Sequence, residues 1–563
     1  MDDLPTIVLK VIIGHVDSVL DAACLCLTNK RLFSILSSLQ IPTLALSKTH
    51  LEINNVIDYE HNPACFESQQ QQQLTFGQSW NQQLQPGCLP LMITSISFGD
   101  HYNQPLPSMA INILPRSLLT LTFGEDFNQP IEKDILPQSL TSLSFGNRYD
   151  RAIAKDVLPQ SLLTLDMGNE FDQPLALPPA LTWLDLGGFF NEPYDSLKLS
   201  TLSALGTLIL PDHTSQNLYI GMFPNSLTSL ILGFYFDSPL KSGVLPQSLT
   251  ELVILGEYTS HLIKAGTLPS SLRTLKSSIY RPSSLQLEAG SLPASLTSLS
   301  SVNRSGLPLL PSGLKTLVLC EGDGDEDDNG MVIKPGMLPP SLTELDIVEN
   351  TQACDIEVGA LPRTLKSLRM RLGFRSPLIP GVIPDSLTEL TLGTRHDGDV
   401  VPGVLPQSLT SLHIRQPLND YKIDQYPSAL KHLTLSNHQL DMESMPATLA
   451  TLTIDSVYNI SWIKVKPNDS KLNHLELVLV MGYKHLSTIR ALKDIRLLIK
   501  TVPNVNTFHL KKLMVGRSNH DVYIRKLNDI TSICTITKPS HYVQQSNIIT
   551  YINIITMDNH PIN

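Results

Sequence analysis

The sequence has few charged side chains and no long apolar run. Charged residues make up only 17% of the 563 residues, and the formal net charge is -11. This balance argues against broad nucleic-acid binding, because basic surface is needed to displace counterions from phosphates. No apolar stretch is long enough to span a bilayer. Asp2 and Asp3 also stand where a signal peptide would carry positive charge. We therefore expect a soluble, cytoplasmic or possibly nuclear protein that binds neither nucleic acid nor membrane.

Cysteines and catalytic motifs are equally sparse. The seven cysteines are odd in number, and their spacing fits neither a disulfide framework nor a zinc site. No nucleophile elbow, phosphate loop or metalloprotease motif occurs. The acidic run from Asp325 to Gly330 is similar to the start of a calcium loop, but its twelfth position is Gly336 instead of glutamate. We expect a non-enzymatic protein without cofactor or metal, in which this run is a solvated loop.

What the sequence has in abundance is an internal repeat. The stretch from Leu136 to Gly146, Leu-Pro-Gln-Ser-Leu-Thr-Ser-Leu-Ser-Phe-Gly, recurs in variants from Leu89 to about Ile454. A period of roughly 22 residues is typical of stacked solenoids. In this stretch Leu143 and Phe145 alternate with serines, as they would in a strand with one buried face. The unit is too short for a hairpin return and a helix, so it predicts one strand per turn in a mostly β, parallel solenoid.

The second half of each unit also repeats. Phe127-Asn-Gln-Pro-Ile131 has counterparts in other units, and Asn or Asp beside the aromatic residue can bond the turn backbone. Pro335-Gly336 and Pro402-Gly403 precede the next Leu-Pro pair and predict type II turns. We expect one aromatic residue per unit to stack into a spine opposite the strands, formed by Tyr102, Phe127, Tyr149, Phe171, Phe190, Phe236 and Tyr258.

Residues 1–40 lack the repeat, and their apolar spacing predicts a short all-α module of three helices. Leu4-Pro5, Ile12-Ile13, Val19-Leu20-Asp21 and the run from Leu27 to Phe33 resemble an F-box. The resemblance implies docking onto a Skp-family adaptor of a cullin ubiquitin ligase. The adaptor contacts that it implies are Leu4, Pro5, Ile12, Leu20, Leu25 and Leu32. The alternative is that these helices only cap the open end of the solenoid.

The repeating units resemble the FNIP repeat, which is related to leucine-rich repeats. This resemblance implies a leucine-rich-repeat-like β-solenoid over residues 74–458. Residues 41–73 are interpreted as a linker with a glutamine run and degenerate first strands. Residues 459–563 are interpreted as generic leucine-rich turns and a C-terminal cap. An F-box followed by such repeats implies a substrate receptor of a cullin-type ligase, whose array binds a target protein. The alternative is a pure recognition scaffold.

Partner-binding candidates come from the strand positions that should face solvent. Most of these positions hold Ser or Thr, so departures from that pattern mark candidate contacts. Trp183 is predicted to lie outward near Asp166 and Asp185. Three consecutive units place an aliphatic residue at one outward register, which makes an apolar stripe of Ile209, Ile231 and Val253. The alternative is that β-branched residues merely suit strands.

Overall fold

A computed structural model describes the repeat array and parts of the sequence on either side of it. The described residues form two compact units, one within residues 47–328 and one within residues 329–563. They are residues 50–53, 72–84, 89–106, 113–213, 216–256, 258, 261–277, 285–320, 331–348, 354–371, 373–374, 378–393, 395–396, 403–414, 426–436, 446, 448–457, 476–481, 507–515, 518–526, 531–538 and 548–556.

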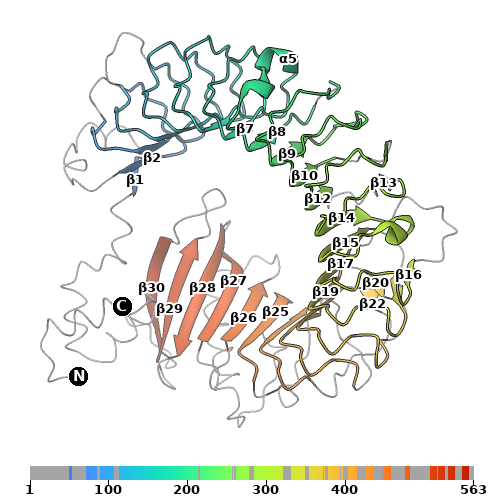
Figure 1. The fold of residues 1–563 in the computed structure, drawn as a ribbon. Coiled ribbons are helices and arrows are strands. Elements are labelled where there is room, and N and C mark those ends of the chain that lie inside the picture. The colour runs from blue at the N-terminus through green and yellow to red at the C-terminus, as the bar shows by residue number, and fades with distance from the viewer. Residues whose placement is uncertain are drawn as a thin grey trace, which may run out of the picture. The chain divides into compact units, whose positions relative to one another are not determined.

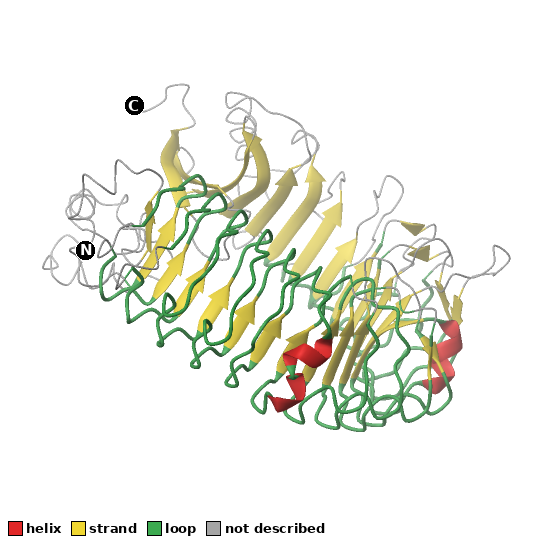
Figure 2. Cartoon of the chain, turned by 90° about the horizontal axis from the view of Figure 1, so that it is seen from above, coloured by secondary structure: helices red, strands yellow, loops and turns green. Residues whose placement is uncertain are grey.

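The first unit is a stack of short parallel strands, one from each repeat (Figure 1). Its strands are β1 (His50–Ile53), β2 (Gln73–Phe76), β3 (Ser95–Ser97), β4 (Thr120–Thr122), β5 (Ser142–Ser144), β6 (Thr164–Asp166), β7 (Trp183–Asp185), β8 (Thr207–Ile209), β9 (Ser229–Leu232), β10 (Glu251–Ile254), β12 (Thr274–Ser277), β14 (Ser298–Val302) and β15 (Thr316–Cys320). Figure 2 shows strands as neighbouring yellow arrows, and the green return segments connect each strand to the next. The prediction of a mostly β, parallel solenoid is confirmed.

The second unit contains parallel strands followed by antiparallel strands. Its strands are β16 (Met331–Ile333), β17 (Glu344–Val348), β18 (Cys354–Ile356), β19 (Ser367–Met370), β20 (Gly373–Phe374), β21 (Glu389–Leu392), β22 (Arg395–His396), β23 (Ser411–Ile414), β24 (His432–Ser436), β25 (Thr451–Val457), β26 (Glu476–Met481), β27 (Thr507–Val515), β28 (Ser518–Lys526), β29 (Thr531–Lys538) and β30 (Ile548–Thr556). Strands β25 to β27 pair in parallel, whereas β27 to β30 form an antiparallel meander.

This meander lies within residues 459–563, which the sequence analysis interpreted as leucine-rich turns and a C-terminal cap. Two leucine patterns of that region, one ending at Leu477 and one running from Leu510 to Val515, coincide with the parallel strands β26 and β27. After Val515, however, β28 already begins at Ser518. A connection this short can only form a hairpin, because a parallel crossover requires a dozen residues or more.

Two leucines per unit form the core. In the unit of β5 these are Leu140 and Leu143, with 0% and 1% of their surface exposed, and their counterparts in the other described units are buried as well. Burying a leucine side chain stabilises a fold by about 1.5–3 kcal/mol. Because each repeat contributes two buried side chains at the same positions, the apolar interior runs from one repeat to the next.

The serine of the Leu-Pro-x-Ser motif has a specific structural role. Ser139 Oγ donates to the carbonyl oxygen of Leu118 in the preceding unit at 2.6 Å, and Ser161 Oγ donates to that of Leu140 at 2.7 Å. The same bond recurs from Ser226, Ser248, Ser271, Ser295, Ser386 and Ser408. The serine therefore joins neighbouring repeats, and its hydroxyl supplies the hydrogen-bond donor for a backbone carbonyl of the preceding repeat.

Substituting Ser139 by alanine is expected to destabilise the array by about 1 kcal/mol, because the Leu118 carbonyl loses its bond from the serine hydroxyl. Urea unfolding followed by circular dichroism measures the effect. Ser142→Ala is the control, since Ser142 is only half-buried on the outward face of β5 and should change stability by less than about 0.5 kcal/mol. Equal losses for both variants would show that this bond is unimportant.

The predicted aromatic stack is present. Ring centroids of Tyr102 and Phe127 are 6.0 Å apart, those of Phe127 and Tyr149 are also 6.0 Å apart, and all three side chains are fully buried. The stack continues through Phe171 and Phe190, and Phe236 and Tyr258 form a further stacked pair. One ring per unit at a fixed position gives this regular spacing.

The Asn and Asp beside each ring accept bonds from backbone N–H groups, and these bonds form a ladder between neighbouring repeats. Asn103 Oδ1 accepts from the backbone N–H of Asn128 at 3.0 Å, and Asn128 Oδ1 accepts from that of Asp150 at 3.2 Å. Asp150 and Asp172 continue the ladder toward Asn191. The acceptor therefore satisfies a backbone donor in the following repeat.

The turn before the Leu-Pro pair has positive φ in many of the repeats, as the Pro-Gly pairs predict. Gly336 has φ of 87° and Gly403 has φ of 85°. In two units an aspartate, Asp134 or Asp156, occupies the same position at φ of 67° and 65°. Aspartate is one of the few side chains that tolerate this region, so the turn is preserved where glycine is absent.

Two parts of the first unit depart from the simple repeat. The degenerate unit near Thr201 contains the short helices α5 (Tyr194–Leu197) and η2 (Leu199–Thr201), and β14 has a register shift followed by η3 (Arg304–Leu309). Return segments also pair in parallel, as in β11 (Leu262–Ile263) with β13 (Gln286–Leu287), β16 with β18 and β20 with β22.

The predicted helices of residues 1–40, their six adaptor contacts and the acidic run from Asp325 lie outside the described residues.

Candidate recognition surface

The apolar stripe lies on the outward face of three neighbouring strands. Ile209 of β8 is in register with Ile231 of β9, which is in register with Val253 of β10. Each side chain is half-buried, whereas the residues directly before and after it in the sequence are buried. Parallel neighbours are about 4.8 Å apart, so the three side chains form one continuous apolar strip.

Trp183 lies on the same face but at the other outward position of β7. It is in register with Thr164 on one side and Thr207 on the other. The position of β7 that aligns with the stripe is Asp185, which is directly opposite Ile209. The structure therefore brings all four sequence candidates onto one sheet face, with Trp183 beside the stripe.

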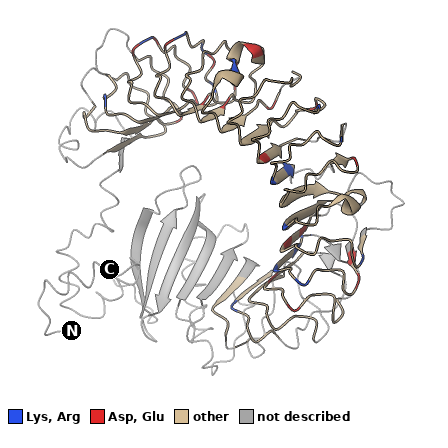
Figure 3. Cartoon of the chain, in the orientation of Figure 1, with Lys and Arg blue, Asp and Glu red and all other residues tan. Residues whose placement is uncertain are grey.

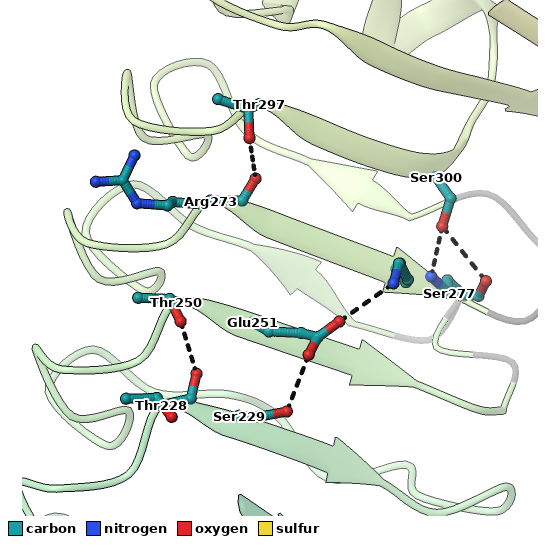
Figure 4. Close-up of polar contacts among 9 residues, drawn as sticks. Thr228, Ser229, Thr250, Glu251, Arg273, Ser277, Thr297 and Ser300 are labelled. Carbon is teal, nitrogen blue, oxygen red and sulfur yellow. Dashed lines mark hydrogen bonds and ion pairs between the residues drawn. The ribbon is translucent and has the colours of Figure 1, made fainter. Parts of the chain in front are cut away.

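The stripe ends at β10 and β12, where polar side chains contact one another. The ammonium group of Lys276, which follows Val253 in the register, lies 3.2 Å from Glu251 Oε1. Glu251 Oε2 also accepts from Ser229 Oγ at 3.1 Å. Figure 4 shows these contacts beside bonds from the Thr250 and Thr297 hydroxyls to backbone carbonyls of the preceding units. Charge at this end of the surface is balanced within the chain.

The opposite end of the stripe is acidic. Asp166 and Asp185 are in register on β6 and β7, and Asp212 follows β8. Asp185 Oδ1 accepts from the Gly187 N–H at 2.9 Å. Burial raises the pKa of Asp185 to about 6, with further increases from the negative charges of Asp166 and Asp212, although the bond from Gly187 lowers it. The ionised form of Asp185 is therefore costly to the folded chain.

Asp185→Asn is expected to stabilise the protein at pH 7.5 by up to about 3 kcal/mol, because a pKa raised from 3.8 to about 6 disfavours the folded state above pH 6. As pH falls from 7 to 4, the wild-type carboxyl takes up a proton in the folded state and the advantage of the variant disappears. Melting temperatures of both proteins at pH 7.5 and 4.0 test this. Glu132→Gln, at an exposed carboxylate, is the control. A difference in melting temperature between wild type and Asp185→Asn that is the same at both pH values would contradict this prediction.

A stack of exposed rings lies on the turns that follow β7, β8 and β9, which we call the rim, and the sequence analysis missed it. The ring centroids of Phe189 and His213 are 4.7 Å apart, and those of His213 and Tyr235 are 4.3 Å apart. Phe189 is 45% exposed and Tyr235 is 58% exposed. We call Trp183, the apolar stripe and these three rings the recognition surface.

A sequence signal for the rim rings exists. Phe189 and Tyr235 each immediately precede a ring of the buried stack, Phe190 and Phe236. Since the buried ring fixes the register, the residue before it must recur at one place along the rim. In earlier units this place holds Asp126, Arg148 and Glu170, so the rim changes from charged to aromatic at β7.

No cluster of three or more His, Cys, Asp or Glu side chains in the described part of the chain could hold a metal ion. None of the helices described there is long and apolar enough to cross a membrane. Figure 3 shows that charged residues are sparse along the described chain, with most of the ribbon carrying neither sign. The recognition surface is thus an apolar and aromatic area on a largely uncharged array.

Comparison with known proteins supports the assignment of the repeat. The family model of the FNIP repeat matches residues 80–126, 127–170, 214–258, 236–278 and 374–416. The array contains FNIP repeats. Residues 171–213, which carry Trp183, Phe189, Ile209 and His213, lie between two of the matches. Part of the recognition surface therefore lies where the family model does not match, whereas Ile231, Tyr235 and Val253 lie within a match.

A solved structure described as CroV588, a novel circular LRR protein structure, is 28% identical to the chain with a TM-score of 0.50. The match covers 73% of this chain and 63% of that chain. The functional domain of InlJ from Listeria monocytogenes, which includes a cysteine ladder, is 13% identical over 75% of this chain and 83% of that one, with a TM-score of 0.28. No curated protein matches the chain. The array is thus leucine-rich-repeat-like.

Proposed function

We propose that the chain is a non-enzymatic recognition protein whose FNIP array binds a target protein through the recognition surface. The observation that carries this proposal is the register of Ile209, Ile231 and Val253, which joins three half-buried aliphatic side chains into one strip on a sheet face. Elsewhere on this face the outward positions are mostly Ser or Thr. An apolar area of this kind, with a polar surround, suits protein docking.

We further propose that residues 1–40 bind a Skp-family adaptor, so that the chain acts as a substrate receptor of a cullin-type ubiquitin ligase in the cytoplasm or nucleus. The F-box-like residues support this part, in particular Leu4, Pro5 and Leu32. The ligase chemistry then belongs to the partners. The array would hold the target protein, while the N-terminal module would connect it to the ligase.

The adaptor part is tested in the full chain with purified Skp-family adaptor. Wild type is expected to co-elute with the adaptor, and an Ile12→Asp/Leu32→Asp double variant is expected to lose it while its melting temperature stays unchanged. If wild type and variant recover equal amounts of adaptor, residues 1–40 are not the docking module.

The second candidate function is a recognition scaffold whose N-terminal helices only cap the stack. The repetitive apolar core of the described array favours it, because a solenoid of this kind requires a cover at its ends. In this case wild type does not bind the adaptor, and the double variant melts earlier or aggregates. The adaptor experiment therefore separates the two functions.

The array part is tested by Ile231→Asp, which places a charge in the middle of the apolar stripe. Target capture should fall at least tenfold with normal folding, since burial of this charge in a docked interface is unfavourable. Thr122→Asp is the matched control, because Thr122 holds the corresponding outward position on β4. Unchanged capture by the Ile231 variant would remove the stripe from consideration.

A further inference from the structure

The acidic end of the apolar stripe, formed by Asp166, Asp185 and Asp212, has no basic partner among the residues that the structure describes. Among the described residues, no Lys or Arg forms an ion pair with Asp166, Asp185 or Asp212. Three other acidic residues do have such partners: Asp126 with Arg148 at 2.8 Å, Glu251 with Lys276 at 3.2 Å, and Asp346 with Arg371 at 2.7 Å. Within the described part of the chain, the negative charge beside the stripe is thus not balanced by an ion pair of this kind.

These carboxylates are held in place. Asp166 accepts from the Ser144 hydroxyl at 2.9 Å and from the Gly168 N–H at 3.0 Å. Asp212 Oδ1 accepts from the Phe234 N–H at 2.9 Å. Their repulsion of Asp185 is a standing cost to the folded chain, and costs of this kind are often retained where function needs them.

The exposed rings lie next to this charge in the chain. Phe189 follows Asp185 by four residues, and His213 follows Asp212 directly. Guanidinium groups stack on aromatic faces while bonding carboxylates, and ammonium groups make the corresponding cation–π contacts. Rings, carboxylates and an apolar strip together favour a ligand that has both positive charge and apolar side chains.

We propose that the recognition surface binds an extended, basic segment of the target protein. Apolar side chains of the segment cover Ile209, Ile231 and Val253, and an Arg or Lys lies between the carboxylates and the ring of Phe189. The inference rests on the proposed protein-binding function and adds the charge of the partner. The same carboxylates disfavour phosphate-bearing partners, that is, nucleic acid and anionic lipid.

The test uses the full chain and three labelled nine-residue peptides in which isoleucine alternates with arginine, serine or glutamate. Fluorescence anisotropy is expected to show the arginine peptide binding at least tenfold more tightly than the serine peptide, with no binding of the glutamate peptide. Affinity for the arginine peptide should fall with added salt, because exposed charges are screened.

Two variants and one control identify the surface. Phe189→Ala/Tyr235→Ala and Asp166→Asn/Asp185→Asn should each weaken binding of the arginine peptide at least fivefold, and the second should also melt later than wild type at pH 7.5. Tyr219→Ala is the control, because Tyr219 is 40% exposed but lies outside the recognition surface. Weaker binding in a more stable protein cannot result from misfolding.

The outcomes separate this inference from the proposed function. If the three peptides bind equally and Ile231→Asp abolishes binding, the stripe recognises protein but the charge preference is wrong. If the arginine peptide binds and neither double variant weakens it, the basic segment is bound elsewhere and the inference fails. If no peptide binds, the inference fails, and target capture by Ile231→Asp decides the proposed function independently.

Discussion

Replacing Gly146 by alanine is expected to destabilise the array by on the order of 3–5 kcal/mol. An added Cβ would lie 1.8 Å from the carbonyl oxygen of Gly124 in the preceding unit. A Cβ added at Gly124 would likewise lie 1.9 Å from the carbonyl oxygen of Gly99. One added at Gly99 would lie 2.1 Å from that of Gly77. The obstructing atoms belong to the backbone, so no change of side-chain rotamer can relieve the clash. The two neighbouring repeats would have to move apart.

The measurement is urea unfolding of wild type and Gly146→Ala, followed by circular dichroism. Gly221→Ala is the control: Gly221 has φ of 84° and no atom within 4 Å of the added Cβ. It should lose only about 1–2 kcal/mol, which is the cost of a left-handed backbone for alanine. If Gly146→Ala unfolds no earlier than the control, the close approach of the glycine backbones does not hold the units in place.

Phe171→Ala is expected to cost about 3–5 kcal/mol. The Phe171 ring is fully buried between Tyr149 and Phe190, with centroids 6.1 and 6.0 Å away. Removing it leaves a cavity that the fixed neighbours cannot fill. In a repeat array such damage is local, because each unit contacts only its neighbours. Limited proteolysis should therefore cut first near residue 171.

Phe189→Ala is the matched control for Phe171→Ala, since the same ring is removed from the exposed rim. Its melting temperature and proteolysis pattern should stay close to those of wild type, with a change below about 1 kcal/mol. Similar losses for both variants would mean that the buried stack contributes little more to stability than the rim.

The sequence predicts the fold well where one position has one dominant role. Leu143 and Phe145 alternate with serines because their backbone is a strand with one buried face, and Phe127 and Tyr149 stack because their spacing equals the repeat. The antiparallel meander after β27 was not predicted, because leucine spacing reports burial but does not report strand direction. The loop length between Val515 and Ser518 sets that direction.

The candidate surface could be predicted only in part. The stripe of Ile209, Ile231 and Val253 follows from strand register, which the repeat fixes. The rim rings of Phe189 and Tyr235 were missed because a sequence pattern gives the buried ring and leaves the exposure of its neighbour open. The raised pKa of Asp185 depends on burial in the folded chain and on the charges of Asp166 and of Asp212, which is 27 positions later in the sequence.

The central claim is that specificity lies where the repeats depart from their pattern, on the outward face of β7 to β10 and its rim. The most direct measurement is selection of a random peptide library on immobilised full-length protein, carried out in parallel with wild type, Ile231→Asp and Thr122→Asp. We predict that wild type and Thr122→Asp enrich the same peptides, in which Arg or Lys neighbours apolar residues, and that Ile231→Asp does not. Enrichment of the same peptides by all three proteins, or of acidic peptides by wild type, would contradict the claim.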